Sequence, residues 1–469
     1  MARTKKEKVK PNWLDPNTTA ENEVLPRYLK WAWTSRAVAL ATNVVLIMQL
    51  TYYCTDMLKM SAGLVGALLL ASKLFDGVTD LVVGFIIDKT HTKYGKARPY
   101  EICIVFVWLF TILLFSTPEF GIVGKSVFVF IMYTLINSIC ATFLNGGDAV
   151  YCSRSIRSEK NRVSVLAFSG SVMMLCSIVI SMVLPQLIAT VGAVKSGWTT
   201  ISCIFGIPFG LIGILRFVFV KEVAGESADK NAPASANNIT FKTSVRCVLQ
   251  NKYIWILAAM TFCVMLITNV GSAVGTYYFK YIIGNIGLAS LLGMTSLITP
   301  FAMMLFPVLA RKFGTVNLVR GGAVMGIVGY GLRTLGGTNL VTLMIGSLLA
   351  TMAVLPISMM INIYLIDCMD YGEWKTGTRV EGMLNSITAF SNKLGSGLAS
   401  GLVGLIMGLA GYEGSLAVQS AAANTSIVAL FNYMPLVLTI VLLVFSIAYK
   451  TDKIMPQIRA ELAERKTAE

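Results

Sequence analysis

Long apolar segments recur along nearly the whole chain, and no other feature limits its possible folds so strongly. A helix needs about 20 mostly apolar residues to cross the hydrocarbon core of a bilayer. Segments of this kind lie near 33–54, 60–87, 100–117, 126–147, 163–191, 199–220, 253–279, 287–310, 316–336, 339–366, 383–411 and 426–449. They leave no room for a soluble domain, and the polar first 30 residues lack the apolar core of a signal peptide. We therefore predict an all-α membrane protein with twelve transmembrane helices.

The few charged residues are distributed unevenly. They make up 13% of the chain, against roughly 25% in soluble domains, yet the net charge is +15. Lysine and arginine gather at both ends and in alternate loops, whereas the intervening loops hold little beyond Lys59, Lys125, Lys195, Lys280 and Arg333. The positive-inside rule predicts that both termini and the 221–252 loop are cytoplasmic. We expect a multi-pass protein of the plasma (inner) membrane. This placement accounts for the basic charge without a nucleic-acid partner.

The clearest break in the apolar pattern is Glu222–Asn238, EVAGESADKNAPASANN, a polar segment after the sixth span. Two six-helix halves joined by a cytoplasmic linker are the layout of the major facilitator superfamily. The nine cysteines show no spacing typical of a metal site or a disulfide framework. The predicted organisation is a cytoplasmic tail (1–32), an N-terminal six-helix bundle (33–221), a linker (222–252), a C-terminal six-helix bundle (253–450) and a second cytoplasmic tail (451–469).

Ionisable residues inside the predicted spans are the strongest indicators of function, since each costs several kcal/mol at the bilayer centre. The second span carries Lys73, Asp76 and Asp80, whose spacings of three and four place them on one stripe of a helix. With Thr79 they offer several hard oxygens, the ligand type that suits a cation such as Na⁺. One carboxyl of so close a pair could carry a proton instead. The alternative is a structural ion-pair cluster with Lys73, although one lysine cannot neutralise two buried acids.

Three further charges lie in or beside spans. Asp148 follows an apolar fourth span and either faces the substrate or belongs to a loop. Lys393 lies midway along the eleventh span with no acid on the same helix, so it must reach a partner across the bundle. The candidate partners are the carboxylates of Asp76, Asp80 and Asp148. Arg36, near the start of the first span, either has a functional role or extends to the membrane interface.

Three sequence blocks carry a resemblance to a known family. Residues 51–56 read TYYCTD, residues 73–99 read KLFDGVTDLVVGFIIDKTHTKYGKARP, and residues 370–393 read DYGEWKTGTRVEGMLNSITAFSNK. In order, they resemble the end of the first helix, the helix 2 signature and the helix 10–11 signature of the glycoside–pentoside–hexuronide:cation symporters, the melibiose-permease family. The blocks sit at the separations found in that family, so the resemblance covers the whole chain.

The resemblance implies roles for individual residues. The implied cation site is formed by Asp76, Thr79, Asp80 and Asn145, with Na⁺ on the two carboxylates as the candidate metal ion. The resemblance points to Asp148 and Lys393 at the substrate site and to Lys73, which stands where the melibiose permease has an arginine. Apart from the resemblance, we also expect Arg36 and Cys152 at that site. The charged residues expected at the cytoplasmic gate are Arg162, Asp367, Asp370, Arg379 and Glu381. We expect pairs between the halves, such as Arg162 with Asp370, to close that gate in the outward-open state.

Two departures from the melibiose permease concern the sugar. That protein has an acid in helix 1 that binds the galactosyl ring, whereas residues 35–43 here read SRAVALATN without any acid. Its helix 5 arginine is replaced here by Ser169 and Gly170. The resemblance therefore implies the transport machinery but does not identify the sugar.

These observations predict a secondary active symporter, not an enzyme, that couples entry of Na⁺, or of H⁺ or Li⁺, to uptake of a glycoside, pentoside or hexuronide by alternating access. We expect it to act without a cofactor, as a monomer in the lipid bilayer, on a sugar or sugar-acid substrate. One alternative is a family member that carries a lipid or another non-sugar solute. A remote alternative is an intramembrane hydrolase using Asp76 and Asp80, but the sequence offers no zinc motif or Ser–His constellation.

Overall fold

The computed structural model describes residues 14, 23–90, 92, 94–222, 241–378, 381–416 and 418–468. Every named element in these ranges is a helix, which confirms the predicted all-α class. Seven helical segments of the described chain are long and apolar enough to cross a membrane, judged by length and composition. Elsewhere in the described chain, several shorter helices follow one another end to end, such as those over residues 286–313.

The first half of the described chain forms a series of rods, each a helix or several helices end to end, that alternate in direction. They are α1 (Arg27–Ile47) with α2 (Leu50–Tyr52) and η1 (Tyr53–Met57); α3 (Ala62–Lys89); η2 (Arg98–Ile102) with α4 (Cys103–Leu114); α5 (Ile122–Thr134) with η3 (Leu135–Ala141), α6 (Thr142–Gly146) and α7 (Asp148–Ser155); α8 (Glu159–Thr190); and α9 (Lys195–Gly213) with α10 (Leu215–Phe219).

The second half repeats this arrangement. Its elements are α12 (Phe241–Gln250); α13 (Lys252–Tyr277) with η4 (Tyr278–Ile282); η5 (Ile286–Ala289) with α14 (Ser290–Thr295), η6 (Ser296–Ile298) and α15 (Thr299–Phe313); α16 (Thr315–Gly336); α17 (Leu340–Thr376); α18 (Glu381–Leu409); α19 (Ala421–Val428) with η7 (Ala429–Tyr433) and α20 (Met434–Ala448); and α21 (Thr451–Ala468).

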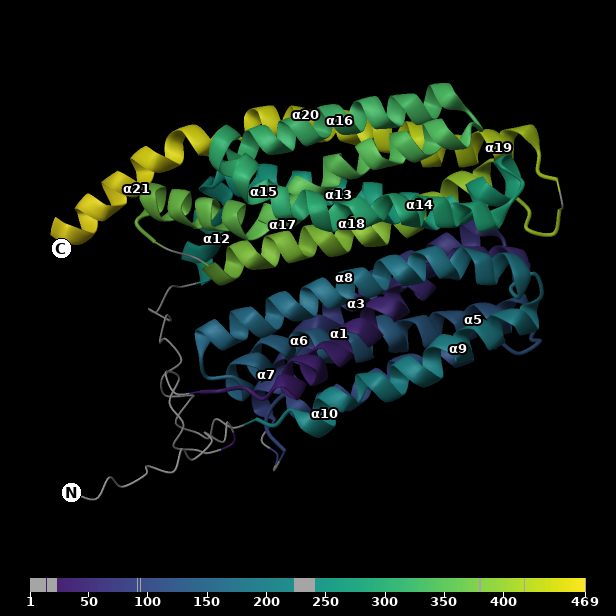
Figure 1. Cartoon of the computed structure of the whole chain (residues 1–469), viewed down its shortest axis with the longest axis horizontal. Helices are drawn as coiled ribbons and strands as arrows, with labels where there is room; N and C mark the ends of the chain where they lie inside the picture. The colour runs from purple at the N-terminus through teal and green to yellow at the C-terminus, as the bar shows by residue number, and fades with distance from the viewer. Residues whose placement is uncertain are drawn as a thin grey trace, which may run out of the picture.

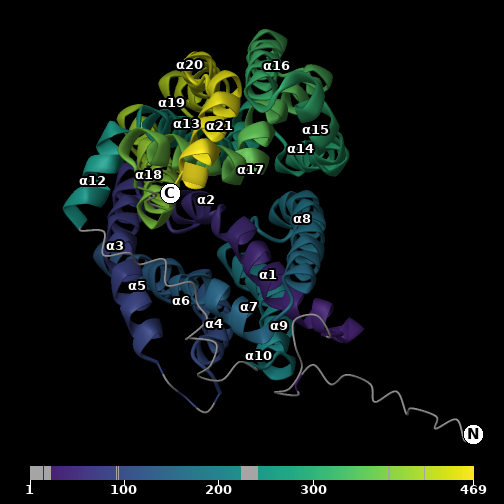
Figure 2. The same cartoon turned by 90° about the vertical axis from the view of Figure 1, so that its left-hand side faces the viewer.

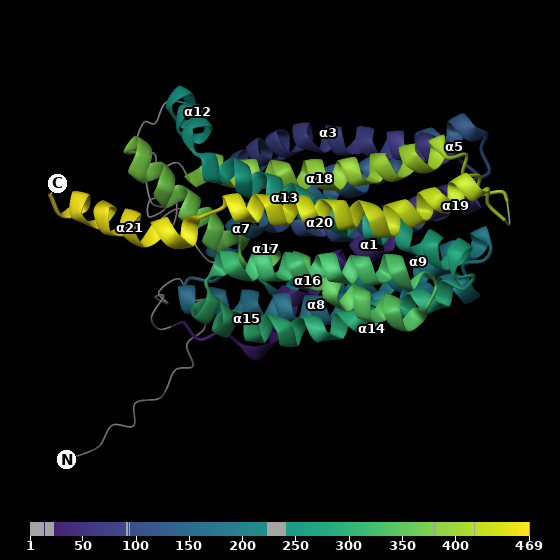
Figure 3. The same cartoon turned by 90° about the horizontal axis from the view of Figure 1, so that it is seen from above.

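The two sets of rods lie against each other as two layers, purple to teal below and green to yellow above (Figure 1). Viewed from above, α13, α16, α18 and α20 run along the long axis together (Figure 3). We call the end that carries α12 and α21 the α21 end and the opposite end the α19 end (Figure 1). Two helix pairs join the layers, α3 with α18 on one flank and α8 with α14 on the other (Figure 2).

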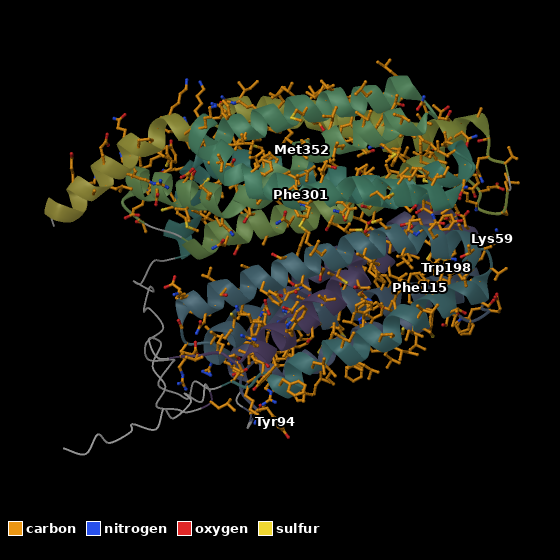
Figure 4. All side chains as sticks on the ribbon, viewed as in Figure 1. Lys59, Tyr94, Phe115, Trp198, Phe301 and Met352 are labelled. Atoms are coloured by element: carbon orange, nitrogen blue, oxygen red, sulfur yellow. The ribbon has the colours of Figure 1, made fainter. Side chains whose placement is uncertain are left out.

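Aromatic packing fills the first half near the α19 end. Phe115 and Trp198 stack with ring centroids 5.4 Å apart (Figure 4). Tyr53 packs edge-on against Phe115 at 5.0 Å, and all three rings are fully buried. Rings of this size bury a large apolar area, and they belong to a buried cluster that also includes second-half residues such as Tyr277.

The α3–α18 contact is close because glycines face each other. A Cβ atom added to Gly66 would lie 2.8 Å from the Gly404 Cα, and one added to Gly397 would lie 2.9 Å from the Lys73 Cβ. Side chains larger than hydrogen do not fit there, so the two backbones approach as small residues allow in membrane helices. This approach sets the charged stripe of α3 opposite the middle of α18.

The structure corrects the sequence reading at three places. Lys280 and Arg333, which we counted with loop residues, lie inside η4 and α16. Those helices run on to Ile282 and Gly336 and end beside glycines with positive φ, Gly284 and Gly337. Residues 451–469, predicted as a tail, form α21 over Thr451–Ala468, and this helix packs against α17.

Candidate functional site

Two carboxylates of α3 and one lysine of α18 meet between the halves. Lys393 Nζ forms an ion pair with Asp80 and lies 3.7 Å from a carboxylate oxygen of Asp76. The Asp76 side chain is buried, whereas those of Asp80 and Lys393 are 39% and 36% exposed. When all three groups are ionised, this α3–α18 cluster carries one net negative charge. It can therefore accept one further monovalent cation or a proton.

Neutral oxygens lie beside these carboxylates. The Thr142 hydroxyl of α6 donates to Asp76 at 3.3 Å, and the Thr79 hydroxyl donates to the Asp76 backbone carbonyl at 2.9 Å. Asn145 is exposed, and its side chain makes no hydrogen bond within the described ranges. Within the described ranges, neither predicted neutral ligand, Thr79 or Asn145, forms a hydrogen bond to a carboxylate oxygen of this cluster. Sequence reasoning missed Thr142, because nothing nearby in the chain distinguishes it from other helical threonines.

Lys73 lies in a cavity and does not pair with the acids. Its ammonium is 5.8 Å from the Tyr133 ring centroid, and no carboxylate of the described chain forms an ion pair with it. The structural cluster with Lys73 that the sequence allowed is therefore not formed, and Lys393 takes that place. The cavity, here called the polar cavity, measures 110 Å³; its polar lining comprises Thr51, Lys73, Tyr133 and Asn137 from the first half and Asn269, Ser396 and Ser400 from the second.

A second group of charges lies within the first half. Arg36 of α1 and Arg216 of α10 both pair with Asp148 of α7, Arg216 at 2.6 Å. The Nε atoms of the two arginines lie 3.7 and 3.6 Å from the Glu101 carboxylate of η2. Arg216 is fully buried, with its guanidinium carbon 3.5 Å from the Trp33 ring centroid. The two positive and two negative charges of this four-charge cluster cancel.

Three predicted substrate residues fall in or beside the four-charge cluster. Arg36 is buried there, so it does not extend to the membrane interface. Cys152 is buried one turn after Asp148, and Asp148 alone of the three keeps a partly exposed side chain, at 36%. Sequence reasoning missed Glu101 and Arg216. The two come from different rods and meet only in the folded chain, although a charge inside an apolar segment was a usable signal for Arg216.

The predicted gate residues lie towards the α21 end. Asp367 and Asp370 of α17 each accept a hydrogen bond from Arg459 of α21, both at 2.9 Å. Arg162 lies on α8 and forms no ion pair with a described residue. The predicted Arg162–Asp370 pair is thus absent here and stays a prediction for the outward-open state. Two further gate residues fall outside the described residues, Arg379 entirely and Glu381 by its side chain.

A polar cluster also joins the halves at the α19 end. The helical segment of α1 and α2 in the first half and that of α13 in the second each end in a π-helical turn, η1 and η4, a feature frequent at functional sites. These turns hold Asp56 and Lys280, which form an ion pair. The buried Asp56 carboxylate also accepts hydrogen bonds from Tyr281 at 2.7 Å and Tyr412 at 2.6 Å. This α19-end cluster links the halves at one end of the interface, and no sequence pattern indicated its partners.

Known proteins resemble this chain in sequence or in architecture. Residues 34–453 match the family described as MFS/sugar transport protein. The isoprimeverose transporter of Lactiplantibacillus pentosus is 28% identical over 432 residues, covering 90% of this chain and 88% of that protein. The putative glycoside/cation symporter YagG of Escherichia coli (strain K12) is 24% identical over 433 residues, covering 90% and 91%. The solved structure of the nucleoside transporter NupG matches in fold, with a TM-score of 0.58, 14% identity and coverage of 89% and 98%.

These matches confirm three predictions, namely the family resemblance, the major facilitator fold and a role other than that of an enzyme. They also make the chain a multi-pass membrane transporter of the sugar and glycoside type.

Proposed function

Because the chain belongs to the MFS/sugar transport family, we propose that it is a symporter in which Asp76 and Asp80 bind the coupling cation. The transported solute is a glycoside, pentoside or hexuronide. The observation that carries this proposal is the position of Lys393, which reaches from the second half to both carboxylates of the first. A cation and this ammonium compete for the same oxygens.

The competition links cation binding to the interface. With no cation bound, Lys393 neutralises one of the two acids and holds α18 against α3. A Na⁺, Li⁺ or H⁺ that enters from outside offsets the remaining negative charge and weakens the hold of Asp80 on the lysine. Lys393 is then free to donate to the solute. It lies close to the polar cavity, since Ser396, which lines that cavity, is one turn further along α18.

The polar cavity supplies the groups that a sugar needs. Amides of Asn137 and Asn269 come from opposite halves, and each can donate to and accept from hydroxyl groups. A solute held by both halves is enclosed only when they come together, as alternating access requires. One charge moving through 100 mV contributes about 2.3 kcal/mol, which supports roughly fifty-fold accumulation.

The test is transport by the purified full chain in lipid vesicles. Labelled xylosides, glucosides and glucuronides are offered under inward gradients of Na⁺, Li⁺ or H⁺, to the wild type and to Asp76→Cys and Asp80→Cys. We expect the wild type to accumulate at least one of them with one of the cations. Each variant should still exchange or bind the sugar but fail to accumulate it. Glu119→Gln, which changes an exposed acid of a loop, is the matched control and should accumulate normally.

Two results would contradict the proposal. If both variants kept the full cation dependence of the wild type, the cation site would lie elsewhere. If no sugar of the panel were transported while a non-sugar solute was, the chain would belong among family members that carry other molecules.

A further inference from the structure

Arg333 is a buried cation without a carboxylate partner. It lies on α16 with 6% of its surface exposed, and its Nη2 donates to the Phe431 carbonyl at 3.0 Å. Its Nε is buried and has no hydrogen-bond acceptor. No acid of the described chain pairs with it. This differs from Arg36 and Arg216, which each contact two carboxylates.

The surroundings of Arg333 hold it in place without neutralising it. Its guanidinium carbon lies 4.0 Å from the Phe431 ring centroid and 5.2 Å from that of Tyr330. Gly346 of α17 leaves room for the stem, because a Cβ there would lie 2.6 Å from the Arg333 Cγ. A guanidinium in such a setting keeps its charge, so the site favours an anion that completes its hydrogen bonds.

The space for that anion is a cavity of about 420 Å³ between the halves. This size lies within the roughly 300–1,000 Å³ typical of small-molecule sites. Ser347 lines it beside Arg333, and its hydroxyl is also buried without a partner. Further polar lining comes from Gln49 and Ser181 of the first half and from Ser272 and Thr276 of the second.

This arginine cavity adjoins the polar cavity. Met48, which directly follows α1, lines both, and consecutive turns of α13 supply Asn269 to one and Ser272 to the other. A ligand whose hydroxyl groups lie in the polar cavity can therefore extend a charged substituent past Met48 towards Arg333. Guanidinium is well suited to an oxyanion, which it binds through paired N–H donors.

We infer that Arg333 and Ser347 form a subsite for an oxyanion substituent, a carboxylate or a sulfonate, on the transported sugar. This inference rests on the proposed function and narrows it to acidic sugars. Asp76 and Asp80 bind the cation at a separate place, so the two assignments can fail independently.

The test compares matched probes on the purified full chain. Methyl β-glucuronide and methyl β-glucoside differ only in the carboxylate, and sodium sulfate serves as an oxyanion without a sugar. Binding is measured by calorimetry at fixed ionic strength, with elution profile and thermal midpoint as checks of folding. We expect the wild type to bind the glucuronide about tenfold or more tightly than the glucoside. Arg333→Gln should abolish this preference, Ser347→Ala should reduce it, and the exposed Ser358→Ala should leave it unchanged.

Each contrary result has a defined meaning. A wild type without preference, or a preference that both Arg333→Gln and Ser347→Ala retain, overturns the subsite. Sulfate that binds through Arg333 while the two sugars bind equally shows a site for a free anion and also overturns it. If Arg333→Gln does not fold, Arg333→Lys and Ser347→Ala decide, since both should weaken only the acidic probe. A wild type that binds neither probe overturns the subsite, and uptake of the xylosides then decides whether the sugar assignment holds. Intact cation dependence with a failed subsite leaves the proposed function standing.

Discussion

Two clusters of charged residues in this protein consist of the same kinds of ion pair but serve different purposes. The four-charge cluster joins α1, η2, α7 and α10 within one half, and its arginines are buried. The α3–α18 cluster joins the two halves, and two of its three side chains are more than one-third exposed. The first cluster balances its charges internally, whereas the second has one negative charge to spare.

This difference follows from what each cluster must do during transport. Contacts within one half can persist while the halves move against each other, so a buried and neutral arrangement suits them. A contact between the halves must break in every cycle, and partly exposed pairs are individually weak enough to break. The unneutralised negative charge of the α3–α18 cluster then favours the binding of a cation there.

The largest expected effect is loss of coupled uptake on changing Lys393 to Met. Without the ammonium, Asp76 and Asp80 hold a cation more tightly, so we expect cation affinity to rise about tenfold while accumulation stops. The thermal midpoint should move little, because the lysine is partly exposed. Uptake assays and Na⁺ titrations in the same preparation check this. Wild-type kinetics would show that Lys393 takes no part in coupling.

The four-charge cluster should instead respond with its stability. Arg216→Met leaves Asp148 and Glu101 with less compensation, and breaking a buried pair in this way costs about 3–5 kcal/mol. We expect a clearly lowered thermal midpoint and poor recovery of monodisperse protein in detergent. Arg320→Met is the matched control. Among the described residues, Arg320 donates only to backbone carbonyls and to Asn317, so its loss leaves no acid without a partner. Equal loss in both variants would contradict the distinction.

The α19-end cluster offers an intermediate case, since it is buried yet joins the halves. Asp56→Asn removes the charge that accepts from Lys280, Tyr281 and Tyr412, and hydrogen bonds to charged groups contribute about 1.5–3 kcal/mol. We expect at least a roughly tenfold population shift towards the state open at this end.

Spin labels on the exposed residues Val123 and Val418 would report this shift as a longer distance between the halves. The labels are placed in a background without other cysteines. Glu119→Gln, which breaks a pair with Lys195 inside one half, is the control and should leave the distance distribution unchanged. An unchanged distribution in Asp56→Asn as well would show that the cluster does not hold this end closed.

The smallest effect is expected at the α21 end. Arg459 is 51% exposed, so its pairs with Asp367 and Asp370 should contribute less than about 1 kcal/mol. Arg459→Gln should therefore shift the thermal midpoint only slightly, by about as much as Arg465→Gln, which removes one hydrogen bond to the Trp374 carbonyl. A loss comparable to that of Arg216→Met would show that α21 is an integral part of the fold.

The sequence by itself was sufficient for the helical class, the major facilitator fold and the family. Apolar segments of membrane-spanning length are a local property that needs no tertiary information. The stripe of Lys73, Asp76 and Asp80 was equally visible, because residues three and four apart share one face of any helix. The need of Lys393 for an acid on another helix also followed from its position midway along a span that holds no acid.

Only the tertiary structure decided which charges meet. From the sequence, Lys73 and Lys393 were both candidates as partners of the two acids, and Asp148 was a candidate partner of Lys393. The close glycine contact of α3 with α18 brings Lys393 to Asp76 and Asp80, and the fold of the first half gives Asp148 to Arg36 and Arg216. An ion pair forms only when two charges on different helices come within a few ångströms, and the spacing of residues along the chain does not determine those distances.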